Sequence, residues 1–207
     1  MIERRYCGFR GAELRKLDDG SESRRVEGYA LLFDRESRDL GGIVEVLDRN
    51  CLDGVLERSD VKCWLNHDER KGILARRRGS EVPQSDAGNS LELELDSTGL
   101  RYAFDAPNTA LGDELLEALR RGDVSESSFA FTVTEDKWER LPDGRAKRTV
   151  LKIDRLWDVS PVYEPAYRGT DVGIDRRGLE ELEAQEGAQR DADLEAYIHE
   201  LEAKINC

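Results

Sequence analysis

Histidine, cysteine and long hydrophobic runs are all scarce in this sequence. It has two histidines and four cysteines, and no zinc-site spacing occurs among Cys7, Cys51, Cys63 and Cys207. We therefore expect no metal or other cofactor, and we interpret the cysteines as reduced thiols of a cytosolic protein. No apolar stretch approaches the roughly 20 residues that span a bilayer. The basic start of the chain has no apolar region behind it, so no secretory signal is expected.

Positive charge is also in short supply. The 45 acidic residues outnumber the 32 lysines and arginines, and the formal net charge is −13. Binding along a phosphate backbone needs a basic face, so nucleic acid is not an expected partner. A membrane is not an expected partner either, because no apolar run is long enough to span one. Hydrophobic residues make up 38% of the chain and charged residues 37%, which indicates a soluble globular protein. Its length suits one domain with an appendage.

The chain divides into two parts by composition. Residues 1–172 carry the strand patterns, and we expect them to form the folded domain. Residues 173–207 contain ten acidic and four basic residues and predict a helical tail that is divided at Gly187. In its second half, one helical face gathers apolar side chains, namely Leu194, Tyr197, Ile198, Leu201 and Ile205. So short a helix needs support, and we expect it to dock on the domain, on a second copy or on another partner.

Short strand patterns dominate the first 170 residues, which predicts an α+β, mainly β fold. The alternating segment LELELD (91–96) is followed by a turn and by LRYAFD (100–105), and these two segments predict a hairpin. A second hairpin is expected from SFAFTVTED (128–136) and RTVLKIDRLWDVS (148–160), which flank the turn LPDGR.

One helix is predicted among these strands. Over residues 108–123, leucines recur at helical spacing, acidic residues come early and arginines come late. Asn108 or Thr109 is the expected N-cap, and Gly122 is the expected C-cap. The helix therefore leads directly into SESSFAF, where three serines precede the aromatic residues of an alternating strand.

Three kinds of residue in the sequence are candidates for acyl-transfer chemistry. His67, in WLNHD, is a candidate general base. The same sequence also fits a histidine at a strand end that only forms a hydrogen bond with a neighbour. Ser128 is a candidate nucleophile on the strand face opposite the aromatic residues. Ser125 and Ser127 are expected to be turn residues, and spacing alone also fits a turn role for Ser128. Asp158 lies between apolar residues, and it could orient a histidine or pair with an arginine.

Two further residues are alternatives to these candidates. Cys63 lies four residues before His67, so a thiol nucleophile of a cysteine hydrolase is a competing interpretation. Glu164 is a second carboxylate close to Asp158 in the sequence, but it lies in a turn bounded by prolines, where we expect it to be exposed.

The motifs occur in an order that resembles the prohead proteases of tailed bacteriophages, which are capsid-maturation serine peptidases related to herpesvirus assemblin. The resemblance covers roughly residues 24–172. The segments that carry it are VEGYALLFDRES, WLNHD, ILARRRGS, RRGDVSESSFAF and LWDVSPVYEPAY. The chain has Asp158 where the family more often has glutamate, and Ala130 where it usually has glycine.

The resemblance implies a fold, an activity and a site. The fold would be an assemblin-like β-barrel with surrounding helices, to which the acidic C-terminal helix is added. The activity would be that of a serine endopeptidase. By resemblance, His67 is the base, Ser128 the nucleophile and Asp158 the third member of the site. Arg168 is the nearest candidate for an arginine that assists the oxyanion.

The resemblance also implies partners and a location. The substrates would be the scaffolding segment of the major capsid protein and the protease itself, cut inside the assembling procapsid in the host cytoplasm. The protease would form a homodimer or a higher oligomer. The tail of residues 173–207 would serve assembly or dimerisation, or would be removed by self-cleavage. The alternative is a catalytically idle scaffold or capsid-lining protein on the same fold.

Overall fold

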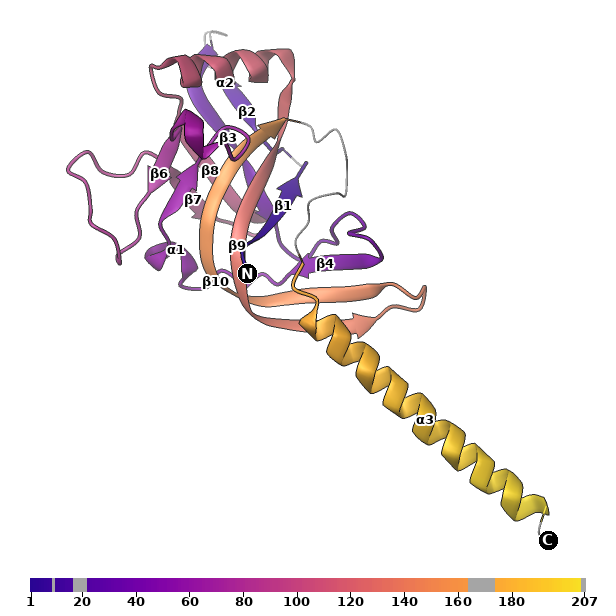
Figure 1. The fold of residues 1–207 in the computed structure, drawn as a ribbon. Coiled ribbons are helices and arrows are strands. Elements are labelled where there is room, and N and C mark those ends of the chain that lie inside the picture. The colour runs from indigo at the N-terminus through magenta and orange to yellow at the C-terminus, as the bar shows by residue number, and fades with distance from the viewer. Residues whose placement is uncertain (9, 17–21, 164–173, 206–207) are drawn as a thin grey trace.

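The computed structural model describes residues 1–8, 10–16, 22–163 and 174–205, and its strands form two sheets (Figure 1). The first sheet has the order β1–β9–β10–β5–β6, and β4 also pairs with β10. Its strands are β1 (Glu3–Cys7), β4 (Ile43–Leu47), β5 (Val61–Cys63), β6 (Ala75–Arg77), β9 (Val124–Arg140) and β10 (Ala146–Tyr163). The second sheet has the order β2–β3–β8–β7, formed by β2 (Glu13–Lys16), β3 (Glu22–Leu32), β7 (Glu92–Leu95) and β8 (Gly99–Asp105). The helices are α1 (Val55–Arg58), the 3₁₀ helix η1 (Glu69–Lys71), α2 (Ala110–Arg121) and α3 (Arg177–Ile205).

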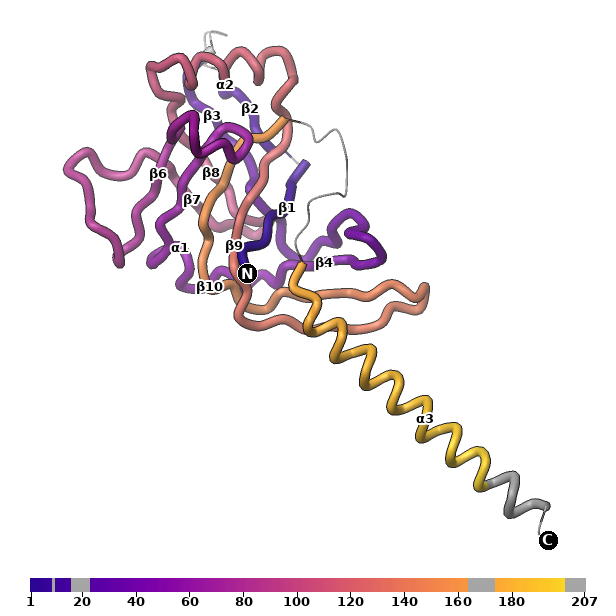
Figure 2. Tube along the Cα trace, viewed as in Figure 1, coloured from indigo at the N-terminus to yellow at the C-terminus, as the bar shows by residue number. Residues whose placement is uncertain are grey.

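The long hairpin of β9 and β10 organises the first sheet. The sequence predicts this pairing, and it is confirmed, but the strands are 17 and 18 residues long rather than short. Register shifts in the pairing, one of them between Leu156 and Asp158, allow both strands to curve, as Figure 2 shows. The α+β, mainly β class is confirmed. The barrel implied by the resemblance is not confirmed, because the described strands lie in two sheets and form no closed barrel.

The two sheets pack on a shared apolar core. Phe129 and Phe131 of β9 stack with their ring centroids 5.1 Å apart, and Tyr102 and Phe104 of β8 are buried in the same cluster. The hydroxyl oxygens of Tyr102 and Ser127 are 2.7 Å apart, so a hydrogen bond also joins the sheets. The aromatic residues of β9 therefore face inward. Because side chains alternate along a strand, the face that carries Ser128 points outward from the core.

Helix α2 confirms the helix predicted from the sequence and fixes where β9 begins. The Thr109 hydroxyl accepts a hydrogen bond from the Gly112 amide at 3.3 Å, which identifies Thr109 as the N-cap. Gly122 ends the helix with a φ of 76°, in the left-handed region that glycine adopts without strain. Leu115 and Leu116 are buried under the helix. Strand β9 starts two residues after the cap, at Val124.

Helix α3 is continuous, so the predicted division at Gly187 is wrong. A glycine inside a helix costs about 1 kcal/mol relative to alanine, which is too little to break a helix of good helix formers. The first half of α3 contacts the β9–β10 hairpin. The indole of Trp138 occupies the space that a side chain at Gly178 would need, and Arg140 pairs with Glu186 at 3.0 Å.

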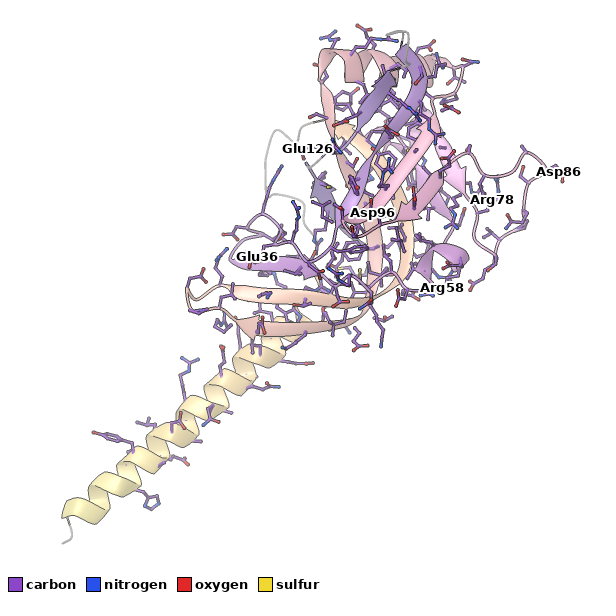
Figure 3. All side chains as sticks on the ribbon, turned by 180° about the vertical axis from the view of Figure 1, so that it is seen from behind. Glu36, Arg58, Arg78, Asp86, Asp96 and Glu126 are labelled. Carbon is purple, nitrogen blue, oxygen red and sulfur yellow. The ribbon has the colours of Figure 1, made fainter. Side chains whose placement is uncertain are left out.

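The second half of α3 projects away from both sheets (Figures 1 and 2). Leu194, Tyr197 and Ile198 are 57%, 57% and 46% exposed, and Figure 3 shows side chains of α3 extending into solvent. These three residues therefore do not dock on the domain. The side chains of Leu201 and Ile205 lie outside the described part. Among the described residues, no helix has both the length and the apolar character that crossing a membrane requires.

A cluster of charged side chains is buried beside the hairpin and ties β1 and β4 to it. Arg148 of β10 donates hydrogen bonds to Glu3 at 2.6 Å and to Glu45 at 3.0 Å. It also donates to Asp136 at 2.7 Å. Arg5 of β1 donates to Glu45 at 2.7 Å and to Glu3 at 2.6 Å. Charged residues are rarely buried unless they are paired, which is why the sequence does not predict this cluster.

We expect Arg148→Met to lower the free energy of unfolding by about 3–5 kcal/mol, because it leaves Glu3 and Glu45 buried with a single arginine between them. Chemical denaturation of the wild-type and variant proteins measures this change. Arg145→Met is the matched control, since Arg145 lies in the exposed hairpin turn and pairs with Asp143, an interaction worth at most about 1 kcal/mol. Equal losses in the two variants would contradict the prediction.

Candidate active site

The structure brings the side chains of His67, Ser128 and Asp158 into contact. The Nε2 atom of His67 lies 2.6 Å from the Ser128 hydroxyl, although the two residues are 61 positions apart in the sequence. The Nδ1 atom of His67 lies 2.9 Å from Oδ1 of Asp158. The imidazole thus lies between a hydroxyl and a carboxylate, which is the arrangement expected of a base that is oriented by an acid.

His67, Ser128 and Asp158 come together because β9 pairs with β10 and β10 pairs with β5. Ser160 of β10 lies directly opposite Ser128, and Asp158 lies opposite Ala130, so all four side chains share one face of the sheet. Strand β5 runs parallel beside β10, with Lys62 opposite Asp158. The chain therefore leaves β5 next to Asp158, and His67 follows within four residues of the strand's end.

The backbone around His67 adopts an uncommon conformation. Asn66 and His67 have φ angles of 54° and 57°, in the left-handed region, which costs a non-glycine residue about 1 kcal/mol or more. The surrounding hydrogen bonds hold it there. The Asn66 amide donates to the carbonyl of Pro161 in β10 at 3.0 Å, and the Asp68 carboxylate caps η1 by accepting from the Arg70 amide at 3.2 Å. The loop that carries the imidazole is thus fixed directly to the strand that carries Asp158.

A hydrogen bond from Ser160 holds the carboxylate of Asp158 in place. The Ser160 hydroxyl donates to Oδ1 of Asp158 at 2.9 Å and accepts from the Trp64 amide at 3.2 Å. Both side chains are buried, Asp158 with 1% of its surface exposed and Ser160 with none. The sequence analysis missed Ser160. Its position two residues after Asp158, on the same face of a strand, is the signal that identifies it.

The contact between His67 and Asp158 is short but not aligned as a hydrogen bond. The 2.9 Å separation of Nδ1 and Oδ1 is well within ion-pair range, yet Nδ1 is buried without a hydrogen-bond partner of suitable geometry. A small rotation of the imidazole ring would bring Nδ1 into line with the carboxylate. Catalytic hydrogen bonds in proteins without substrate are often misaligned in this way and tighten when substrate binds.

The neighbouring serines do not join this group. Ser127 is buried on the opposite face, where its hydroxyl contacts Tyr102 and donates to the Gly11 carbonyl. Ser125 is exposed near the start of β9. Both residues belong to the strand, so the expectation that they are turn residues is wrong. Strand β9 starts before these serines, at Val124, because the chain changes direction within two residues of the helix cap at Gly122.

The cysteine alternative is not supported by the environment of the thiol. Cys63 has no exposed surface. Burial raises the pKa of its thiol well above the ordinary value, and the negative charge of Asp158 raises this pKa further. Burial likewise raises the pKa of Cys51 to about 12. A thiol must ionise to act as a nucleophile, so neither residue is suited to that role.

Two residues named from the sequence lie outside the described part of the chain. These are Arg168, the candidate oxyanion residue, and Glu164, the alternative carboxylate. The described residues also contain no group of three or more histidine, cysteine, aspartate or glutamate side chains that could hold a metal ion.

The observed contacts are suited to proton transfer from a serine hydroxyl. Nε2 of His67 can accept the proton of Ser128 at 2.6 Å, and the carboxylate of Asp158 can stabilise the resulting imidazolium. Ser128 has no exposed surface, and the His67 side chain is 12% exposed. The hydroxyl is therefore covered in the free chain, and the imidazole forms part of that cover.

Comparison with families and known structures supports one assignment. Curated proteins give no significant match. The solved structure of the capsid assembly protease gp21 of bacteriophage T4 is similar with a TM-score of 0.42 and 14% sequence identity, over 79% of this chain and 97% of that chain. This likeness is weak, and the assignment rests instead on a family model, the caudovirus prohead serine protease, which matches residues 11–185. The match spans most of the sequence, and the chain therefore belongs to the caudovirus prohead serine protease family.

Proposed function

We propose that the protein is a serine endopeptidase of capsid maturation, with Ser128, His67 and Asp158 as its catalytic triad. The observation that carries this proposal is the 2.6 Å contact between Nε2 of His67 and the Ser128 hydroxyl. Membership of the prohead serine protease family supports the peptidase class. The burial of Asp158 and its hydrogen bond from Ser160 support a carboxylate held in one orientation.

The proposed mechanism is acyl transfer in two stages. Nε2 of His67 removes the proton of Ser128 while the serine oxygen attacks the carbonyl carbon of a peptide bond. His67 then gives this proton to the departing amine, which leaves an ester on Ser128. A water molecule, deprotonated by His67, attacks the ester, and the proton returns to the serine as the acid product leaves. The negative charge of Asp158 stabilises the imidazolium in both stages.

The negative charge on the substrate oxygen needs donors of its own. We assign this role to backbone amides near Ser128 and to Arg168, which the family resemblance indicates. Donors placed at the developing oxyanion commonly contribute 10²–10³-fold or so to the rate. A substrate reaches Ser128 only after the side chains that cover it have moved, because the hydroxyl has no exposed surface in the free chain.

The proposed substrates are the scaffolding segment of the major capsid protein and the protease itself, both cut inside the procapsid. In this account, residues 1–172 form the protease domain. The acidic tail of residues 173–207 would serve assembly or dimerisation, or would be lost by self-cleavage. The projection of α3 from the sheets and the exposure of Leu194, Tyr197 and Ile198 support a role outside the domain.

Co-expression with the matching major capsid protein tests the proposal. We expect the capsid protein to lose its scaffolding segment with the wild-type protease and to stay at full length with His67→Ala. Mass spectrometry of both proteins gives the cleavage sites and shows whether the tail is retained. A catalytically idle scaffold predicts full-length capsid protein in both samples. Cleavage that continues with His67→Ala would show that this residue is not the base.

A further inference from the structure

Strand β1 forms the outer neighbour of the strand that carries Ser128. It pairs antiparallel with β9, and Tyr6 lies directly opposite Ser128. Residues directly opposite each other in an antiparallel pair point to the same face of the sheet, with their Cβ atoms about 4.5–5.5 Å apart. Tyr6 therefore stands beside Ser128 on its own face. The family match begins at residue 11, so β1 precedes the matched region.

The burial pattern of β1 confirms which way its side chains point. Glu3, Arg5 and Cys7 are buried, whereas Arg4 and Tyr6 are exposed. The first three share a face with Phe129 and Phe131 and point into the protein. Tyr6 keeps 39% of its surface exposed, so a large aromatic side chain borders a serine that is itself completely covered.

Buried charges hold this short strand in place. Arg5 donates to both Glu3 and Glu45, at 2.6 and 2.7 Å, and its guanidinium lies 5.5 Å from the centre of the Phe131 ring. Arg148 binds the same two glutamates. Since one face of β1 is tied to the interior, the backbone of Tyr6 has a defined position opposite Ser128.

The other members of the site approach Ser128 from the opposite side. Strand β9 lies between β1 and β10, and His67 and Asp158 belong to the side of β10 and β5. When Ser128 attacks a peptide carbonyl, the imidazole of His67 must stay in contact with the serine oxygen, so the substrate cannot occupy the position of the imidazole. The side of β1 and Tyr6 is the side of β9 that His67 and Asp158 do not occupy, so a substrate can extend there.

We propose that Tyr6 is a substrate-contacting residue whose ring packs against an apolar side chain next to the scissile bond. This inference rests on the proposed protease function. Aromatic rings supply a large and rigid apolar contact. An apolar contact of this size discriminates between substrates by roughly 10–100-fold in kcat/KM. Tyr6 would thus select which peptide bonds are cut, while the triad cuts them.

Peptides that span the cleavage sites mapped in the capsid protein test this role. The residue on each side of the scissile bond is changed in turn between leucine and serine, and kcat and KM are measured separately. For wild type, we expect leucine to be preferred at one of the two positions. Tyr6→Thr, which keeps a strand-forming residue, should lower kcat/KM for the leucine peptide by roughly 10–100-fold and remove the preference. Tyr6→Phe should behave as wild type.

Two controls separate this role from a loss of folding or of catalysis. Leu95→Thr makes a comparable change at an exposed residue of β7, an edge strand of the second sheet, and should leave the leucine preference unchanged. Labelling by a small fluorophosphonate reports directly on Ser128 and should be equal in wild type and Tyr6→Thr. Unchanged leucine preference in Tyr6→Thr, or faster cleavage of every peptide, overturns the proposed contact alone. Absence of labelling in wild type overturns the protease proposal itself.

Discussion

Ser128→Ala is expected to reduce peptide-bond cleavage by at least about 10⁴-fold, the scale on which loss of a serine nucleophile acts in other serine proteases. The substitution removes the only atom that attacks the substrate. It also removes the contact that Nε2 of His67 makes with the hydroxyl, and the His67 side chain is 12% exposed. Alanine also fits the position, because it is smaller than serine by only the hydroxyl oxygen. The rate is measured with purified protein and a peptide from the capsid protein.

The neighbouring exposed serine supplies the control for this prediction. Ser125→Ala makes the same chemical change three residues earlier in the chain and should retain wild-type activity, because Ser125 is exposed and does not contact His67. Both variants should unfold at similar temperatures. Loss of activity in Ser125→Ala with normal activity in Ser128→Ala would assign the nucleophile to Ser125 and contradict the account.

Asp158→Asn is expected to lower kcat by about 10⁴-fold while the protein stays folded. Asparagine has almost the same shape, so it can still accept the hydrogen bond from Ser160. It carries no negative charge, however, and cannot stabilise the imidazolium of His67. If its amide group turns toward Nδ1, it also favours the wrong tautomer of the imidazole. Turnover at saturating peptide, with circular dichroism as the folding check, measures the effect.

Glu164→Gln is the matched control for the carboxylate. It removes one negative charge six residues farther along the chain and should leave kcat near the wild-type value. A wild-type rate in Asp158→Asn together with a large loss in Glu164→Gln would assign the third role to Glu164. Wild-type rates in both variants would show that the site is a catalytic dyad of His67 and Ser128, with no third carboxylate.

The sequence identifies the three site residues through the order of their motifs but not through their spacing. His67 and Ser128 are 61 positions apart, and no local pattern indicates that they meet. Their contact depends on β5 and β9 both lying next to β10, which a single sequence does not determine. The resemblance to a family supplies that missing information. Ser160 could have been found from strand alternation once Asp158 was chosen.

The errors of the sequence analysis come from local rules that tertiary structure overrides. Serines favour turns, yet Ser127 is placed in a strand because its hydroxyl finds partners in Tyr102 and Gly11. Glycine weakens helices, yet α3 continues through Gly187. No local rule indicates that Glu3 and Arg5 are buried, because they are neutralised by Glu45 and Arg148. Each partner is distant in the sequence, so no local pattern reveals it.

Covalent labelling is the most direct test of the central claim, that Ser128 is the nucleophile of a serine protease. The wild-type protein is treated with a fluorophosphonate, digested and mapped by mass spectrometry. The account predicts one adduct, on Ser128, which is absent from His67→Ala because the hydroxyl is then no longer activated. An adduct on another residue, or no adduct from a protein that still cleaves its capsid protein, would contradict the account.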